Sequence, residues 1–275
     1  MCYKLSQERE LKAFLLEKGL DSERVNSNPM PSKKELLNSD PISEEEVRWC
    51  KSVIGGLLYF SRGTRWDISH AMARIAQNLK NPNLGTMRAI KRVGGYLNSD
   101  VSYALVGGGT RCNNELTIMV DANHQGDPEL TTKSQSGVII LLNGTPIHWR
   151  SNKQPKTTLS PTESEVYALS VGVKDSRLTG WVMDELGVGV GYPLRVATDS
   201  SGAYSFKGDT CPTSKLRGCF DYRAKWVREL VDDKEIELYL VKGEANLADI
   251  FTKCHSTREF RRRRDLILDE FSRMT

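Results

Sequence analysis

Four acidic residues stand in local settings that suit metal-assisted chemistry: Asp121, Glu165, Asp199 and Asp249. Asp121 and Asp199 each close a short β-branched, apolar run, the pattern of a buried strand that presents a side chain at a sheet edge. Glu165 lies in the first turns of a long helical stretch, and Asp249 opens a segment near the end of the chain. Carboxylates gathered from such elements repel one another unless cations lie among them. Their hard oxygen ligands suit Mg²⁺ or Mn²⁺, and paired ions of this kind cleave or form phosphodiester bonds.

Either Glu163 or Glu165 could be the carboxylate that the helix contributes to this group. Two residues apart on a helix, they point about 200° away from each other, so one of them can face a sheet. Glu165 begins a stripe of small or apolar residues at Ala168, Leu169 and Gly172, which suits packing on strands. Glu163 falls in the first turn, where a carboxylate favours the helix dipole without a catalytic role. The pattern therefore favours Glu165.

The second half of the chain alternates strand-like and helix-like segments that would position these residues. The pattern predicts strands at 115–122, 136–142 and 145–151, a helix at 162–186, a strand ending at Asp199, helices at 200–207 and 219–232, and a strand at 235–241 before the last helices. Hairpins can link the first three strands, whereas a helical crossover returns a parallel strand. We therefore expect an α/β domain with a mixed sheet.

The first half reads as helical. An amphipathic helix near 7–18 precedes a proline-containing linker, and Ser43 is expected to cap the next helix, which has an acidic first turn. A further helix is predicted to begin at an N-cap Asp67, and another to end near Asn98. We expect boundaries that divide the chain into 1–44, 45–112 and 113–275.

Composition is that of a soluble globular protein, with 275 residues, 39% hydrophobic and 27% charged. No apolar run approaches the ~20 residues that span a bilayer, and the first residues are too charged for a signal peptide. Six cysteines lie far apart without a CxxC pair, which favours reduced thiols in an intracellular compartment. The net charge of +4 does not by itself indicate a nucleic-acid binder.

Several ordered motifs from residue 131 onward resemble the RNase H domain of copia-type LTR-retrotransposon Pol polyproteins. The family has Ser-Thr-Ser-Gly before a strand, then Pro-Ile-x-Trp, Lys-Gln and Ser-Thr-Glu-Ala-Glu-Tyr. The matching segments here are Ser134 to Gly137, Pro146 to Trp149, Lys153-Gln154 and Thr162 to Glu165. TDSSGA around Asp199 resembles the family's C-D-N-x-S-A, and NLADIFTK at 246–253 is close to x-L-A-D-I-L-T-K. Residues 43–99 resemble the connection region that precedes this domain.

The resemblance implies an RNase H-like fold: a five-stranded mixed sheet flanked by helices, preceded by a helical connection region and, at 1–44, by the end of the reverse-transcriptase thumb. It implies Mg²⁺-dependent cleavage of the RNA strand in an RNA/DNA hybrid, with two ions and Mn²⁺ as a possible substitute. Asp121, Glu165, Asp199 and Asp249 would be the catalytic metal ligands. The implied partners are the hybrid and the polymerase portion of the same polyprotein, without a membrane. The implied location is intracellular, in a cytoplasmic virus-like particle or the nucleus.

Contacts to nucleic acid are expected from polar and basic residues beside these motifs: Ser134, Ser136, Asn152, Lys153, Gln154 and Lys215. The basic run Arg261–Arg264 would spread its charges around a helix, which favours a solvated face over a nuclear-targeting or nucleic-acid-binding tail. The family's two late histidines are missing, so no proton-handling histidine is predicted.

Two other functions remain open. One is a non-catalytic RNase H-like remnant that binds nucleic acid or a protein, which the departures from the family at Trp66, Asn123 and His124 favour. The other is a DNA-directed, integrase-like nuclease of the same fold, which the NLADIFTK motif fits badly. No Tyr-x-Asp-Asp motif occurs, so this chain is not expected to polymerise by itself.

Overall fold

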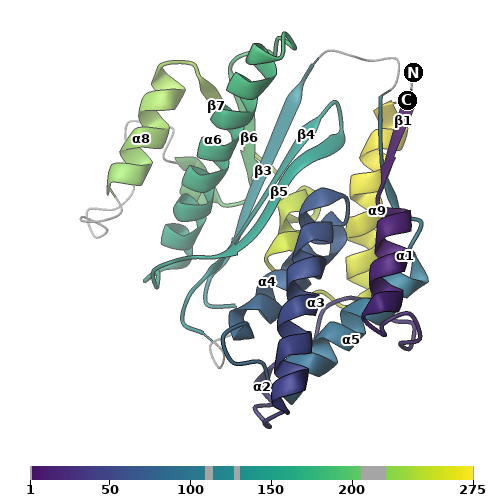
Figure 1. The fold of residues 1–275 in the computed structure, drawn as a ribbon. Coiled ribbons are helices and arrows are strands. Elements are labelled where there is room, and N and C mark those ends of the chain that lie inside the picture. The colour runs from purple at the N-terminus through teal and green to yellow at the C-terminus, as the bar shows by residue number, and fades with distance from the viewer. Residues whose placement is uncertain (1, 109–113, 127–130, 206–220, 275) are drawn as a thin grey trace. The chain divides into compact units, whose positions relative to one another are not determined.

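The computed structural model describes residues 2–108, 114–126, 131–205 and 221–274 (Figure 1). The chain forms two compact units. One comprises Tyr3–Val106 with Cys254–Asp265, and the other comprises Gly107–Lys253 with the two ends of the chain. Among the described residues, no helix combines the length and the apolar character needed to cross a membrane.

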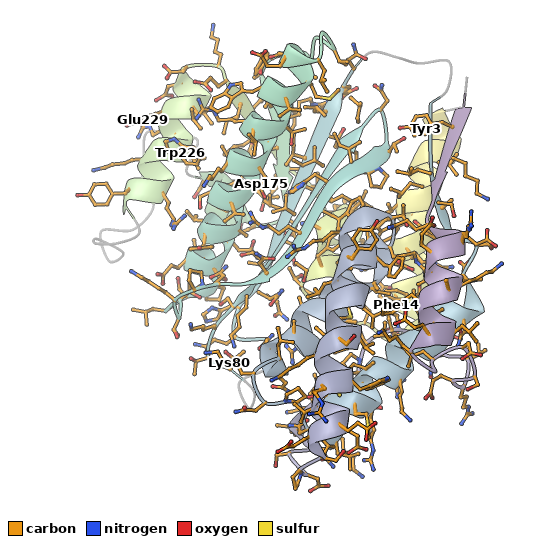
Figure 2. The ribbon with its side chains drawn as sticks, viewed as in Figure 1. Tyr3, Phe14, Lys80, Asp175, Trp226 and Glu229 are labelled. Carbon is orange, nitrogen blue, oxygen red and sulfur yellow. The ribbon has the colours of Figure 1, made fainter. Side chains whose placement is uncertain are left out.

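The elements before residue 109 are mostly helical. They are β1 (Cys2–Ser6), α1 (Glu8–Glu17), α2 (Lys33–Leu37), α3 (Glu44–Gly63), η1 (Trp66–Ile68), α4 (Ser69–Ile75), η2 (Ala76–Asn78), α5 (Leu84–Ser99) and β2 (Ala104–Gly108), with β1 and β2 paired. Ser43 caps α3 as predicted, because its side chain accepts the amide of Glu46 while the Glu46 carboxylate accepts the amide of Ser43. Phe14 of α1 packs on Phe60 of α3 with ring centroids 5.4 Å apart (Figure 2).

The prediction that Asp67 is an N-cap is wrong. Asp67 lies in η1, and α4 has Ile68 at its N-cap position. The carboxylate of Asp67 accepts from Nε and Nη2 of Arg65 at 3.0 and 2.8 Å and from the hydroxyl of Tyr96 at 2.6 Å. Burial raises the pKa of Asp67, but the Arg65 guanidinium outweighs it and holds the pKa below its usual value. A buried carboxylate that accepts from a bidentate arginine and from a tyrosine has its charge compensated without capping a helix.

The basic run also differs from the prediction of a solvated face. Arg263 is 8% exposed and forms an ion pair with Glu259 at 2.8 Å. Arg264 donates to the hydroxyl of Tyr96 at 3.3 Å, and Arg261 donates to Ser27 at 2.6 Å. These three arginines thus make contacts within their own compact unit, because a helix turns part of any four-residue run inward.

The other unit is built on a five-stranded mixed sheet. Its strands are β3 (Leu116–Asn123), β4 (Gln135–Leu142), β5 (Thr145–Lys153), β6 (Leu194–Thr198) and β7 (Ile236–Leu240), in the order β5-β4-β3-β6-β7. β3 pairs antiparallel with β4, and β4 pairs antiparallel with β5. The pairs β3–β6 and β6–β7 are parallel. This is the RNase H-like topology that the sequence predicted.

Helices follow and separate these strands. They are α6 (Pro161–Glu185), α7 (Ser201–Tyr204), α8 (Asp221–Asp232), the 3-10 helices η4 (Gly243–Ala245) and η5 (Leu247–Phe251), and α9 (Thr257–Met274). The core joins Ile118 and Val120 of β3 to Leu169 and Val173 of α6, and Trp226 of α8 packs against this core (Figure 2). Burial of each large apolar side chain contributes about 1.5–3 kcal/mol, so this layer fixes how α6 lies on the sheet.

Candidate metal centre

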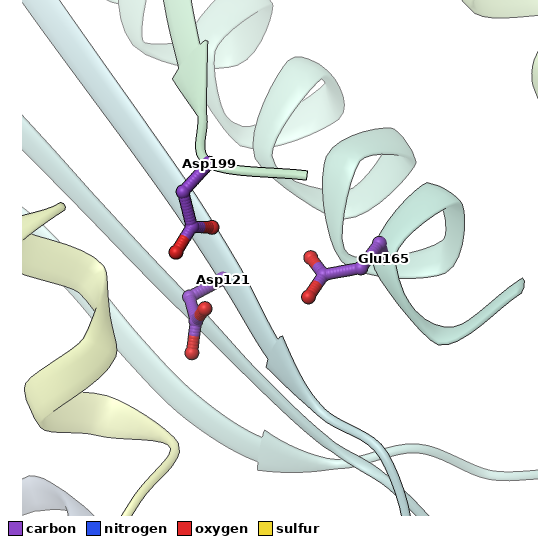
Figure 3. Close-up of side chains that lie close together, drawn as sticks. All are labelled: Asp121, Glu165 and Asp199. Carbon is purple, nitrogen blue, oxygen red and sulfur yellow. The ribbon is translucent and has the colours of Figure 1, made fainter. Parts of the chain in front are cut away.

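Three of the four predicted carboxylates meet at one end of the sheet. Asp121, Glu165 and Asp199 each offer a carboxylate oxygen, and these oxygens all lie within 4.8 Å of one another (Figure 3). Met119 of β3 pairs with Ala197 of the parallel strand β6. Two residues further on, Asp121 and Asp199 therefore lie side by side on the same face, because strand side chains alternate with a period of two.

Glu165 reaches this centre because α6 lies very close to β3. An ideal Cβ on Gly172 would come within 2.2 Å of Cγ1 of Val120, so a side chain at that position would push the helix away from the strand. Gly172 lies two turns after Glu165 on the same face. Glu163 has a different role: its carboxylate accepts the amide of Leu159 at 2.6 Å, at the start of the helix. The helix thus turns Glu165 toward the sheet, as the pattern predicted.

The electrostatics of the three carboxylates favour a bound cation. Burial, followed by the charges of Asp121 and Asp199, raises the pKa of Glu165 to about 9. Burial is also the main cause that raises the pKa of Asp121 to about 6. Oε2 of Glu165 is buried and has no hydrogen-bond partner among the described residues. Carboxylates that repel one another, one of them with a buried oxygen that lacks a donor, fit a hard divalent ion, which would hold all three in their charged form.

Asp249 lies beside the triad and is joined to it by Lys253. Asp249 is in η5 and is 2% exposed, and one of its carboxylate oxygens accepts from the ammonium of Lys253. The same ammonium lies 3.5 Å from Oδ1 of Asp121. Burial lowers the pKa of Lys253, but Asp121 and Asp249 outweigh it, so the net shift is upward and the amine stays charged. Among the described residues, three of the four predicted ligands form the group of mutually close oxygens and the fourth contacts this cation.

Asn246 ties the elements of the centre together, although sequence analysis gave it no role. The residue is fully buried, and its Nδ2 donates to the carbonyl of Val120 at 2.8 Å and to Oδ1 of Asp199 at 3.1 Å. Its Oδ1 accepts the amide of Ala248 at 3.1 Å and so caps η5. One side chain therefore links β3, the end of β6 and the helix that carries Asp249. The signal was present, because Asn246 opens the NLADIFTK motif.

Thr252 and Gly137 hold the same segment against the sheet. The hydroxyl of Thr252 donates to Oδ2 of Asp121. Gly137 lies opposite Asp121 in the β3–β4 pair. An ideal Cβ on Gly137 would come within 2.7 Å of the carbonyl oxygen of Ala248 and 2.8 Å of Cγ2 of Thr252. Glycine at this position therefore lets η5 lie directly over β4.

The predicted nucleic-acid contacts divide into buried and accessible residues. Ser134, Ser136 and Gln154 are buried. Ser134 shares a 2.7 Å hydrogen bond with the hydroxyl of Thr158. Nε2 of Gln154 donates to Ser136 at 2.8 Å and to the carbonyl of Ser164 at 3.0 Å, which fixes the strands to the start of α6.

The other three predicted contacts differ in their surroundings. Asn152 is exposed and Lys153 is half-buried. Lys215 lies outside the described residues. Contact between any of the six residues and nucleic acid stays a prediction.

Comparisons with known proteins agree with the motifs. No family model matches the chain. The chain is 27% identical over 269 residues to the retrovirus-related Pol polyprotein from transposon TNT 1-94 of Nicotiana tabacum, covering 96% of this chain and 20% of that protein. It is 26% identical over 253 residues to the corresponding polyprotein from transposon RE1 of Arabidopsis thaliana, covering 90% and 17%. Over most of its length, the chain is similar to the retrovirus-related Pol polyproteins of plant transposons. It spans about a fifth of the length of these curated relatives.

Further similarities cover smaller parts of the chain. The chain is 35% identical over 127 residues to secreted RxLR effector protein 161 of Plasmopara viticola, covering 46% of this chain and 87% of that protein. Among solved structures, LC11-RNase H1 from compost is 19% identical with a TM-score of 0.39, covering 50% of this chain and 93% of that one. The foamy viral protease-reverse transcriptase in complex with an RNA/DNA hybrid is 16% identical with a TM-score of 0.41, covering 76% and 26%.

Proposed function

We propose that this Pol region is a ribonuclease H that cleaves the RNA strand of RNA/DNA hybrids with two Mg²⁺ ions, for which Mn²⁺ can substitute. The observation that carries the proposal is the convergence of Asp121, Glu165 and Asp199 at the end of the parallel strand pair. In this proposal Asp249 is the fourth ligand, and the substrate hybrid and the polymerase portion of the polyprotein are the partners.

The positions of the residues indicate which would hold the ions and which would orient the ligands. Bound divalent ions supply an activated water and neutralise charge on the scissile phosphate. Asp121 lies close to Glu165 and Asp199, and it also shares the ammonium of Lys253 with Asp249, so Asp121 is the residue that both ligand sets share. Thr252 and Asn246 orient Asp121 and Asp199 through hydrogen bonds. Burial lowers the local dielectric and strengthens each of these charge interactions.

We further propose that 113–275 is the ribonuclease H domain, 45–112 the connection region and 1–44 the end of the polymerase thumb. The compact units divide the chain at Val106 and Gly107, near the boundary between 45–112 and 113–275. They also group Cys254–Asp265 with the N-terminal segment. A truncated chain that ends at residue 253 would therefore remove part of the N-terminal unit as well, since it lacks helix α9.

A non-catalytic scaffold is the second candidate function. The observation that favours it is the contact of Lys253 with both Asp121 and Asp249, since a fixed ammonium there would neutralise ligand charge permanently. A scaffold of this kind would still bind a hybrid through cationic contacts to phosphate, but it would not cut.

The test is cleavage of a labelled RNA/DNA hybrid by the full chain with Mg²⁺ or Mn²⁺, and with EDTA. We expect fragments of the RNA strand with either metal, intact DNA, and no products in EDTA. Binding of the hybrid without cleavage in either metal would favour the scaffold. Equal cutting of single-stranded RNA in EDTA would reveal a metal-independent contaminant and leave the proposal without support.

A further inference from the structure

Lys253 places a positive charge among buried carboxylates that the proposed function assigns to metal. Lys253 follows Asp249 by four residues, and its amide donates to the carbonyl of Asp249 at 3.2 Å. Its ammonium contacts carboxylate oxygens of Asp249 and of Asp121, which are 2% and 1% exposed. The side chain of Lys253 is 40% exposed. The ammonium therefore bridges two buried anions, although the side chain that carries it is partly open to solvent.

The two groups of carboxylates around Asp121 differ in how their charge is compensated. In the group with Glu165 and Asp199, the oxygens lie within 4.8 Å of one another, and Oε2 of Glu165 is buried without a hydrogen-bond partner among the described residues. In the pair with Asp249, the ammonium of Lys253 already contacts both carboxylates. Like charges at such distances favour any cation between them, and a lysine ammonium is a compact point charge on a flexible stem.

We propose that Lys253 is an internal counter-ion that competes with a divalent ion for the position between Asp121 and Asp249. The inference rests on the proposed function and deepens it. The triad can accept an ion without displacing a protein charge, whereas the second position becomes available when the ammonium moves toward solvent. The two positions should therefore fill in order, with the one beside Lys253 as the weaker.

The geometry allows this movement. Lysine has a flexible four-carbon stem, and a side chain that is 40% exposed can turn outward without disturbing a packed core. Asn246, Thr252 and Gly137 hold η5 in place independently of Lys253. Loss of the Lys253 charge should therefore leave Asp249 near its present position.

The test is to measure Mn²⁺ binding to the full chain in the absence of substrate. Calorimetry and electron paramagnetic resonance of free Mn²⁺ are the two methods. We expect two binding steps in the wild type. Lys253→Met removes the charge and keeps the length of the side chain, and it should tighten the weaker step by about tenfold while leaving the tighter step unchanged. Lys253→Arg keeps the charge and should keep the weaker step weak. Lys174→Met, on the exposed side of α6, is the matched control and should change neither step.

Thermal unfolding provides a second readout. In EDTA, Lys253→Met should melt below the wild type, because Asp121 and Asp249 then repel each other without compensation. Added Mn²⁺ should raise its melting temperature by more than it raises that of the wild type. Two Mn²⁺ steps that are the same in wild type and Lys253→Met would overturn the role of Lys253 and leave the nuclease proposal intact. Absence of Mn²⁺ binding in every variant would overturn both.

Discussion

Asp121 connects the two charge groups of the site, and its substitution is the most direct test at the scale of one residue. We expect Asp121→Asn to lower cleavage by about three orders of magnitude, because several kcal/mol of charge stabilisation at the metal are lost. Asparagine fills almost the same volume, so the fold should persist. The measurement is single-turnover cleavage of a labelled hybrid, with circular dichroism as a check of folding.

Glu163→Gln is the matched control for this substitution. Glu163 accepts the amide of Leu159 at the start of α6, and a first-turn carboxylate contributes only about 0.3–1 kcal/mol to its helix. Cleavage should stay near the wild-type rate. Wild-type turnover by Asp121→Asn, or a collapse of activity in Glu163→Gln, would contradict the assignment of the site.

The raised pKa of Glu165 predicts how the stability of the metal-free protein depends on pH. Its pKa is raised to about 9 from an ordinary value of 4.5, so the folded protein holds a proton that the unfolded chain releases between those values. The free energy of unfolding of the metal-free protein should therefore be highest below the ordinary pKa and should fall as pH rises toward about 9. Glu165→Gln should remove this part of the fall. Melting temperatures in EDTA across the window, compared between the two proteins, measure it.

Metal binding should show the opposite dependence on pH. A cation must displace the proton on Glu165, so Mn²⁺ affinity should rise with pH up to about 9. Calorimetric titrations in buffers with different ionisation enthalpies would detect the released proton. An affinity that is flat across this window would show that Glu165 is not a ligand.

At the scale of elements, the contact of η5 with β4 depends on Gly137. An alanine there would place its Cβ within 2.7 Å of a backbone oxygen, so η5 must shift, at a cost of about 1–3 kcal/mol. We expect Gly137→Ala to lower the melting temperature and to reduce cleavage, because η5 carries Asp249. Gly189→Ala is the control, since its added Cβ meets nothing within 4 Å. Equal stability and activity of the two variants would show that η5 is not held in this way.

Local pattern predicted most of these elements. Three segments repeat with the period of their own secondary structure: the run before Asp121, the run before Asp199 and the stripe that begins at Glu165. The sequence therefore predicted the two strands, the helix and the side of each that faces the core. The role of Asp67 could not be predicted from the sequence, because its partner Tyr96 lies 29 residues away. An Asp before a helical run has the pattern of a cap. Asn246 and Lys253 were missed for the same reason, since their contacts with β3 and Asp121 depend on tertiary packing.

At the scale of the whole molecule, the charge is nearly balanced, with 39 basic and 35 acidic residues. Binding to a hybrid should therefore depend on a limited number of cationic contacts, and its affinity should fall linearly with the logarithm of salt concentration, by a slope of roughly −0.9 for each phosphate contacted. Asp121→Asn should keep this slope. Fluorescence anisotropy of a labelled hybrid at several salt concentrations measures both, and affinity independent of salt would contradict phosphate recognition.

The position of Asn246, Asp249, Thr252 and Lys253 within eight consecutive residues makes all four side chains vulnerable to one truncation. A stop codon or frameshift just after β7 would leave the five strands and the triad in the reading frame but would delete every side chain that locks them from the η5 side. A chain truncated there would retain Asp121, Glu165 and Asp199 but would lose the hydrogen bonds to Val120, Asp121 and Asp199. We therefore expect an intact octapeptide at 246–253 to be as necessary for an ordered triad as the three carboxylates themselves.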